Sequence, residues 1–200
     1  CIRDRYRMLN IVIFGAPGSG KGTQSENLIK KYNLAHISTG DVLRAEKAAG
    51  TELGKLADSF MSKGQLIPDD LMIDILASVF DQKIKAGDCK GVIFDGFPRT
   101  IPQGVALSEM LEKRGQAISA VVSLDVPEEE LIERLINRGK QTGRNDDNYE
   151  TIKARLDVYY NQTTPLKELF EKEGKLYSIE GVGSVEDIFS RISSVIDKVK

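Results

Sequence analysis

Short apolar runs recur along this chain, and longer segments of mixed apolar and polar residues separate them. Four runs predict buried parallel strands and a shorter fifth run is a further candidate, at residues 11–14, 92–94, 120–124, 176–179 and, for the shorter run, 34–37. None of them alternates strictly between apolar and polar residues, which is typical of strands that helices cover on both faces. The pattern therefore predicts the central layer of an α/β domain.

The segments between these runs have helical periodicity. In the clearest case, after Ser184, apolar residues fall on one face at a spacing of 3.6: Val185, Ile188, Phe189, Ile192, Val195, Ile196 and Val199. Ser184 and Asp187 resemble a capping box at the start of this helix. Another helix is predicted over residues 24–32. Alternating strands and helices predict a doubly wound, parallel, five-stranded sheet with its ligand site at the carboxyl ends of the strands.

Two segments depart from simple alternation. Residues 39–73 are longer than one crossover helix requires and contain several helix breakers, so a small helical insertion is expected: Gly40, Gly50, Gly54, Gly64 and Pro68. Residues 139–143, Gly-Lys-Gln-Thr-Gly, predict a short polar loop between two helices. Both segments are candidates for parts that move to close over a site.

Composition and charge narrow the function classes. The 200 residues suit one domain, and a net charge of −2 argues against nucleic acid or a membrane surface as a partner. No apolar run approaches the ~20 residues of a membrane span. Cys1 and Cys89 have no metal-binding spacing and predict free thiols in a reducing compartment, so a cytoplasmic location is expected. Residues 1–7 are basic, lack a signal-peptide core and are expected to be an extension before Met8.

The candidate chemistry begins with a glycine-rich loop, residues 15–23, between the first strand and the helix after it. Glycines let backbone N–H groups turn inward around an anion, and the helix adds its positive end. Lys21 can reach the terminal phosphates, so the loop predicts a bound nucleoside triphosphate. Gly22 stands where the usual motif has Ser or Thr, which leaves a metal-binding role for the hydroxyl of Thr23 open. A plain strand-to-helix turn is the alternative.

Charged residues follow the strands and helices at positions that suit phosphate. The arginines near element ends are Arg44, Arg99, Arg134, Arg138, Arg144 and Arg155. An arginine fork grips phosphate oxygens at two points, although any one of them taken alone also fits solvated surface charge. Arg99 lies just beyond the strand at 92–94, where ligands bind in such sheets. Asp95 directly follows that strand and suits Mg²⁺, bound directly or through water; a helix cap or turn is its alternative.

Taken together, these motifs resemble those of adenylate kinases with a short lid, within the nucleoside monophosphate kinases. The resemblance runs from about Met8 to the end of the chain and rests on four segments: 15–24 (the ATP loop), 36–44 (HISTGDVLR), 95–103 (DGFPRT and then Gln103) and 138–155 (three arginines around GRNDDN). Tyr149 stands where many relatives have an acidic residue. The chain has no four-cysteine cluster, so the resemblance implies no structural zinc.

The resemblance also implies the domain organisation. It implies a P-loop NTPase-type fold in a single domain over residues 8–200, divided into a core (8–37, 74–137 and 145–200), a helical NMP-binding insertion (38–73) and a short lid loop (138–144). The family usually acts as a monomer, and its Mg²⁺ is reached largely through waters.

Roles for single residues come from the matched positions. The resemblance implies ATP binding by Gly18, Ser19, Gly20, Lys21, Gly22, Thr23, Arg138 and Gly183, although a plain turn remains the alternative for Gly183. It implies AMP binding by Thr39, Arg44, Gln65, Leu66, Ile67, Gly96, Phe97, Pro98, Arg99, Gln103, Arg144 and Arg155. The implied catalytic residues are Lys21, Arg99, Arg138, Arg144 and Arg155, with Asp95 holding Mg²⁺ through water and Asp146 and Asp147 ordering the arginines.

The implied activity is reversible phosphoryl transfer from MgATP to AMP, giving two ADP. A UMP/CMP kinase is the nearest alternative, but pyrimidine-specific relatives tend to carry Ala and Asn where this chain has Thr39 and Gln103. A non-catalytic nucleotide-binding protein would be expected to lose Lys21 or an arginine. A plain ATPase would have no use for the AMP-binding segments. His36, the only histidine, is expected to be a core or turn residue.

Overall fold

The computed structural model describes residues 8–200, so the expectations for residues 1–7 and Cys1 fall outside it. Its centre is a sheet of five parallel strands in the order β2-β3-β1-β4-β5. The strands are β1 (Leu9–Gly15), β2 (Leu34–Ser38), β3 (Gly91–Asp95), β4 (Ala120–Asp125) and β5 (Leu176–Glu180). All five strand predictions are confirmed, and each strand extends one to three residues beyond the predicted run.

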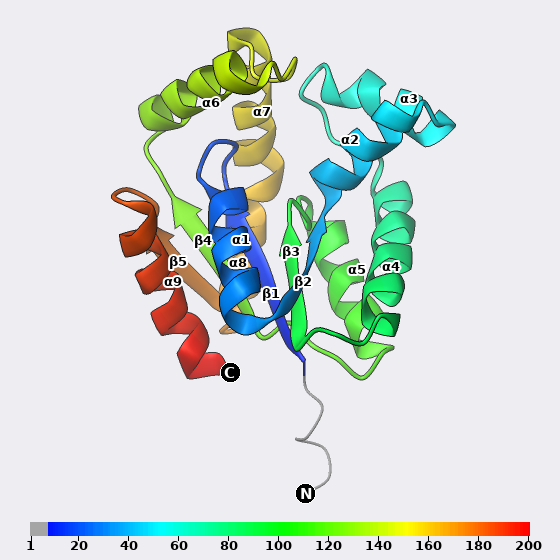
Figure 1. Ribbon diagram of the computed structural model, residues 1–200, viewed down its shortest axis with the longest axis vertical. Helices are drawn as coiled ribbons and strands as arrows, with labels where there is room; N and C mark the ends of the chain where they lie inside the picture. Colours follow the sequence, from blue (N-terminus) through cyan, green and yellow to red (C-terminus); the bar gives the residue numbers. More distant parts are fainter. Residues whose placement is uncertain (1–7) are drawn as a thin grey trace, which may run out of the picture.

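Helices cover both faces of the sheet (Figure 1). One face carries α1 (Lys21–Tyr32) and α9 (Val185–Val199), and the other carries α4 (Asp69–Lys85), α5 (Ile101–Glu112) and α8 (Pro165–Lys172). Successive β1 residues divide between the two cores: Ile11 and Ile13 pack on the first side, and Val12 and Phe14 pack on the second. Burial of both faces explains why the strands show no polar alternation.

The predicted helix starts differ in accuracy. The Ser184 hydroxyl accepts a hydrogen bond from the Asp187 backbone N–H at 3.1 Å, so this cap of α9 is confirmed. The first helix begins at Lys21 and not at residue 24, because the left-handed Gly20 ends the loop immediately before it.

Within the part of the chain that the structure describes, no helix is long and apolar enough to cross a membrane.

The insertion consists of α2 (Thr39–Ala49) and α3 (Glu52–Met61), which pack against each other beside the carboxyl edge of the sheet (Figure 1). The Ser38 and Thr51 hydroxyls cap these two helices. Because α4 already begins at Asp69, the boundary expected at residue 73 lies inside a helix.

The prediction of a polar loop at residues 139–143 was wrong. Helix α6 (Glu128–Thr142) continues through most of it, and the chain turns only at Gly143 before α7 (Tyr149–Val158). Gly139 does not break the helix: a Cβ there would lie 3.0 Å from the Asp147 Cβ and carbonyl oxygen. This glycine permits close approach of the returning chain, and Lys140 and Gln141 favour the helix. A π-helix, η2 (Tyr159–Thr163), joins α7 to α8.

Candidate active site

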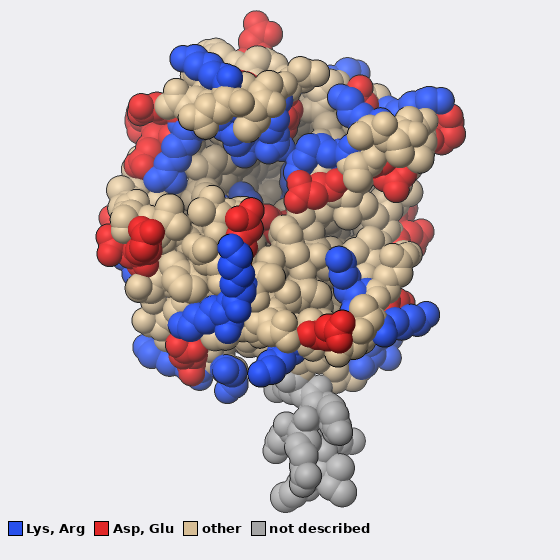
Figure 2. Space-filling model, viewed as in Figure 1, with Lys and Arg blue, Asp and Glu red and all other residues tan. Residues whose placement is uncertain are grey.

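A cavity of about 450 Å³ opens at the carboxyl edge of the sheet, between the glycine-rich loop, the α2–α3 insertion and the α6–α7 pair. Figure 2 shows it as a hollow bordered by Lys and Arg side chains. A second, smaller cavity adjoins it beside the insertion. Arg44, Arg99 and Arg155 line both, so the two cavities meet at a group of cations.

The glycine-rich loop forms the floor of the larger cavity. Gly18 and Gly20 have φ angles of 85° and 91°, which an L side chain rarely adopts, so glycine permits this loop shape. The buried Ser19 hydroxyl has no hydrogen-bond partner within residues 8–200. The positive φ angles at Gly18 and Gly20 give the loop the turned backbone that an anion-binding loop needs.

Lys21 lies folded back over this loop. Its ammonium group donates hydrogen bonds to the carbonyl oxygens of Gly15 at 2.7 Å and Ala16 at 3.0 Å. Burial lowers its pKa from 10.5 to about 8; Asp95 opposes the shift and the charge of Arg99 adds to it. Lys21 is thus a cation that any anion in the cavity would stabilise.

Asp95 ends β3 directly beside the loop. It lies opposite Ile13 of β1 and Ser38 of β2, and it lines the larger cavity with Thr23. The His36 ring nitrogen Nε2 lies 3.7 Å from the Asp95 carboxylate and has no hydrogen-bond partner within residues 8–200. His36 therefore lies beside a candidate site residue and not in the hydrophobic core or a turn, contrary to the prediction.

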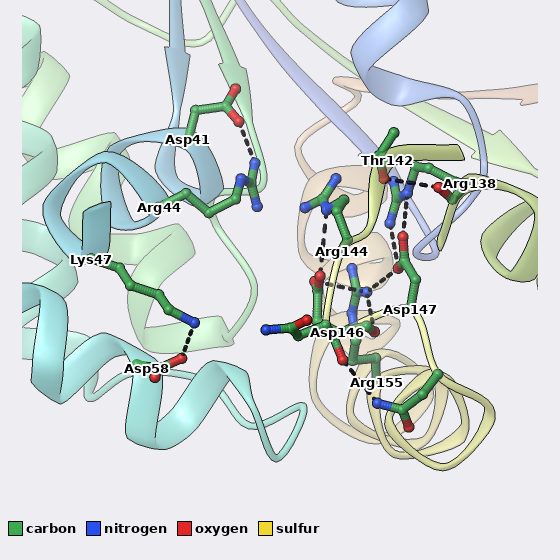
Figure 3. A network of polar contacts seen from close by, with 12 residues as sticks. Asp41, Arg44, Lys47, Asp58, Arg138, Thr142, Arg144, Asp146, Asp147 and Arg155 are labelled. Atoms are coloured by element: carbon green, nitrogen blue, oxygen red, sulfur yellow. Dashed lines mark hydrogen bonds and ion pairs between the residues drawn. The ribbon is translucent and has the colours of Figure 1, made fainter. Parts of the chain in front are cut away.

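Two aspartates connect the arginines of α6 and α7 (Figure 3). Arg138 donates to both carboxylate oxygens of Asp147 at 2.7 Å, and Arg155 donates to Asp147 at 3.0 Å. Arg144 and Arg155 also form ion pairs with Asp146, at 3.4 and 3.0 Å. Three cations are thereby held along one wall of the larger cavity.

These pairs shift the pKa values of their members. Burial alone would raise the pKa of Asp147, but the hydrogen bond from Arg138 and the surrounding guanidinium charges lower it below its usual range. The same hydrogen bond raises the pKa of Arg138. Burial lowers the pKa of Arg155 despite the opposing effect of both aspartates. The wall therefore remains charged at neutral pH, and an incoming anion is attracted to it.

Arg99 lies between the two cavities. Its Nε donates to the carbonyl oxygen of Gly96 at 2.7 Å, and burial, with the charge of Arg155, lowers its pKa to about 10. Arg44 approaches the same region from α2, ion-paired with Asp41 (Figure 3). Anions entering from either cavity would meet these guanidinium groups.

Apolar and polar residues together line the smaller cavity. The apolar ones include Leu43, Met61, Ile67 and Met72, and the polar ones include Thr39 and Gln103. The Thr39 hydroxyl donates to the carbonyl oxygen of Gly96 at 2.9 Å. Apolar side chains beside fixed polar groups suit a flat heterocyclic ring.

Nearly all candidate residues border one of these cavities. The exceptions are Ser19, which is buried in the loop, Asp147, whose side chain is buried behind the arginines, and Gly183. Within residues 8–200, no three His, Cys, Asp or Glu side chains form a group that could hold a metal ion. Asp95 and Thr23 offer oxygen atoms beside the loop, a donor set that suits Mg²⁺ reached mainly through waters.

Comparison with known proteins places this site in a family. The family model described as adenylate kinase matches residues 13–175. This chain belongs to the adenylate kinase family. An adenylate kinase of Bacteroides fragilis is 65% identical over 190 residues, which cover 95% of this chain and 99% of that protein. Adenylate kinases of Parabacteroides distasonis and Porphyromonas gingivalis are 61% and 52% identical over 193 residues, 96% of this chain and 100% and 98% of theirs.

Some residues that line the larger cavity received no role from the family resemblance. Arg134, which the sequence offered only as one of several candidate phosphate-binding arginines, lines the larger cavity, pairs with Glu130 and donates to the carbonyl oxygen of Gly181 at 3.2 Å. It lies one helical turn before Arg138, so both arginines share one face of α6. Tyr159 and Thr163 of η2 also line this cavity, and no local sequence pattern marks them.

Proposed function

We propose that this chain transfers the terminal phosphoryl group of ATP to AMP, reversibly, and forms two ADP. Membership of the adenylate kinase family supports the reaction. The observation that carries the proposal is the pair of adjoining cavities, which share Arg44, Arg99 and Arg155. One cavity contains a phosphate-binding loop and the other suits a base. Two nucleotides bound there would meet with their phosphates at the shared arginines.

We assign ATP to the larger cavity. The loop N–H groups from Gly18 to Thr23 bind its phosphates, and Lys21 exchanges the carbonyl oxygens of Gly15 and Ala16 for phosphate oxygens. Arg138 contacts the transferred group from α6. We assign Gly183 a more distant backbone contact with the ATP base.

We assign AMP to the smaller cavity, with its phosphate on the arginines. Arg44 and Arg99 grip the AMP phosphate, while Thr39 and Gln103 contact the adenine. The remaining members of this set are Gln65, Leu66, Ile67, Gly96, Phe97, Pro98, Arg144 and Arg155, which line one or both cavities. The acceptor is already an anionic phosphate oxygen, so the reaction needs no strong general base.

The chain's cations account for the catalysis. Lys21, Arg99, Arg138, Arg144 and Arg155 offset the repulsion between two polyanions and stabilise the charge of the transition state. Mg²⁺, when bound with ATP, supplies further positive charge at the phosphates; Asp95 would hold its waters. Because the aspartates fix the arginines in advance, little reorganisation is needed during transfer.

We propose that the insertion (38–73) and the lid (138–144) close over the bound nucleotides. Closure keeps water from replacing AMP as acceptor. Helix α6 extends through Thr142, so the moving lid includes the end of α6 and the turn at Gly143. We propose that the chain acts as a monomer, as the family resemblance implies. The cytoplasmic location stays a prediction.

Incubation with MgADP alone tests the proposed function. The reverse reaction should convert ADP into equal amounts of ATP and AMP, without release of inorganic phosphate. A nucleotide-binding protein would leave ADP unchanged. A hydrolase would release phosphate, and either result would overturn the proposal.

A further inference from the structure

Gln103, which the proposed function places at the adenine, is held at both ends of its side-chain amide. It lies in the first turn of α5, is 2% exposed and lines the smaller cavity. The backbone N–H of Arg99 donates to its Oε1 at 2.8 Å. Its Nε2 donates to the Asp69 carboxylate at 2.7 Å. The amide is therefore positioned before any ligand arrives.

Asp69 reaches this amide from a different helix. It is the first residue of α4, and its second carboxylate oxygen accepts a hydrogen bond from the Thr100 hydroxyl at 3.0 Å. Thr100 is also the residue that caps α5, because its hydroxyl accepts from the Gln103 backbone N–H at 3.3 Å. One carboxylate thus connects the start of α4 to the start of α5 and fixes the rotation of Gln103.

The two partners allow the amide only one orientation. A carboxylate accepts hydrogen bonds and a backbone N–H donates them. Rotating the amide by 180° would bring Oε1 against the Asp69 carboxylate and Nε2 against the Arg99 N–H. Both contacts would then be repulsive, and two buried hydrogen bonds would be lost. Asp69, together with the Arg99 N–H, therefore decides which atom of Gln103 lies on which side.

Each end of the amide retains one hydrogen-bonding capacity. The Nε2 has a second N–H, and the Oε1 has a second lone pair; within residues 8–200 no other side-chain bond engages them. Adenine presents a ring acceptor, N1, beside an amino donor, so a correctly oriented amide binds it at two points. Hypoxanthine has the same shape but presents a ring N–H donor beside a carbonyl acceptor. It would need the rotated amide.

We propose that Asp69 is a specificity-determining positioning residue, which locks Gln103 in the orientation that accepts adenine and rejects 6-oxopurines. The inference rests on the proposed function, because it requires AMP to occupy the smaller cavity. Asp69 acts only through Gln103 and Thr100. Its loss should therefore alter the choice of base while leaving the ATP side and the chemical step intact.

The test compares AMP and IMP as acceptors, with saturating MgATP, in Asp69→Ala, Asp69→Asn and the parent protein. Asp70→Asn is the matched control. Asp70 is the exposed neighbour at the same helix end, so this substitution removes the same charge as Asp69→Asn but leaves the hydrogen bonds of Gln103 in place. The parent should prefer AMP to IMP by about 100-fold or more. Asp69→Ala should reduce the AMP/IMP ratio of kcat/KM by about tenfold or more, mainly through KM for AMP.

The remaining measurements distinguish a lost position of Gln103 from a general loss of folding or activity. The KM for ATP and kcat with AMP should stay within about twofold in Asp69→Ala, and Asp69→Asn, which keeps one acceptor oxygen, should show a smaller fall in the ratio. A folded Asp69→Ala with an unchanged AMP/IMP ratio would overturn the inference and leave the proposed function standing. If that variant does not fold, an unchanged ratio in Asp69→Asn and in Asp69→Leu overturns it. A parent protein that does not phosphorylate AMP would refute both.

Discussion

At the residue scale, the site depends on cations that are costly to bury. Lys21 and Arg99 both have a lowered pKa, chiefly because the folded chain removes water from them. For Lys21 the folded pKa lies below the unfolded one, so its protonated form costs stability below about pH 8. That cost is relieved as the pH rises from about 8 to 10.5. Bound phosphate would offset the same cost, which favours ligand binding.

The titration of Lys21 predicts a pH dependence of ATP use. Phosphate groups favour the protonated ammonium, so kcat/KM for ATP should fall about tenfold per pH unit above about pH 8. Steady-state rates with saturating AMP from pH 6.5 to 10 measure this. In Lys21→Arg, whose side chain stays charged, residual activity should lack that fall. A parent profile that remains flat to pH 10 would contradict the role of Lys21.

Arg99 gives a second test at the same scale. Arg99→Ala should raise KM for AMP about tenfold or more, because the phosphate loses a two-point contact, while the Kd for ATP changes less than about threefold. Steady-state kinetics and equilibrium titration with ATP measure the two effects. Arg114→Ala, at an arginine paired with Asp81 outside both cavities, is the control. Equal losses for AMP and ATP would refute the assignment.

At the element scale, Asp147 links α6 to α7. Its side chain is fully buried between Arg138 and Arg155, and those guanidinium groups hold the pKa of its carboxyl below the usual range. A carboxyl whose folded pKa is lowered stabilises the fold above its unfolded pKa. This contribution is lost as pH falls through the folded value.

Asp147→Asn should therefore lower the free energy of unfolding by about 1–3 kcal/mol at pH 7. The difference from the parent should shrink as the pH falls below about 4, where the parent carboxyl also becomes neutral. Urea unfolding at several pH values measures it. Asp157→Asn, at an exposed aspartate on α7, should change little at any pH. A difference that is constant with pH would show that charge is not the cause.

The accuracy of the sequence predictions also varies by element. The strands were predictable because parallel strands that are buried on both faces appear as continuous apolar runs. The cap at Ser184 was predictable because its hydrogen bond joins residues only three positions apart. The end of α6 was not predictable, because a glycine in a sequence resembles a helix breaker. In the structure, Gly139 instead allows close contact with Asp147 across the turn. The Asp69–Gln103 pair was equally invisible: it joins positions 34 apart and depends on how α4 packs on α5.

At the scale of the whole molecule, the fold brings distant motifs to one edge. The loop after β1, the end of β3 and the arginines of α6 and α7 all meet at the larger cavity (Figures 1 and 2). Family resemblance predicted this gathering, and five parallel strands with β1 at the centre produce it. The individual roles of the gathered residues stay predictions, as does the monomeric state.

The most direct test of the central claim is ADP formation from MgATP in a coupled assay. AMP, CMP, UMP and GMP are supplied in turn, with one reaction that lacks any acceptor. Two adjoining cavities, with Thr39 and Gln103 lining the smaller one, predict fast turnover with AMP and little with the others or with none. Faster turnover with CMP or UMP, or ADP formation independent of any acceptor, would contradict the account.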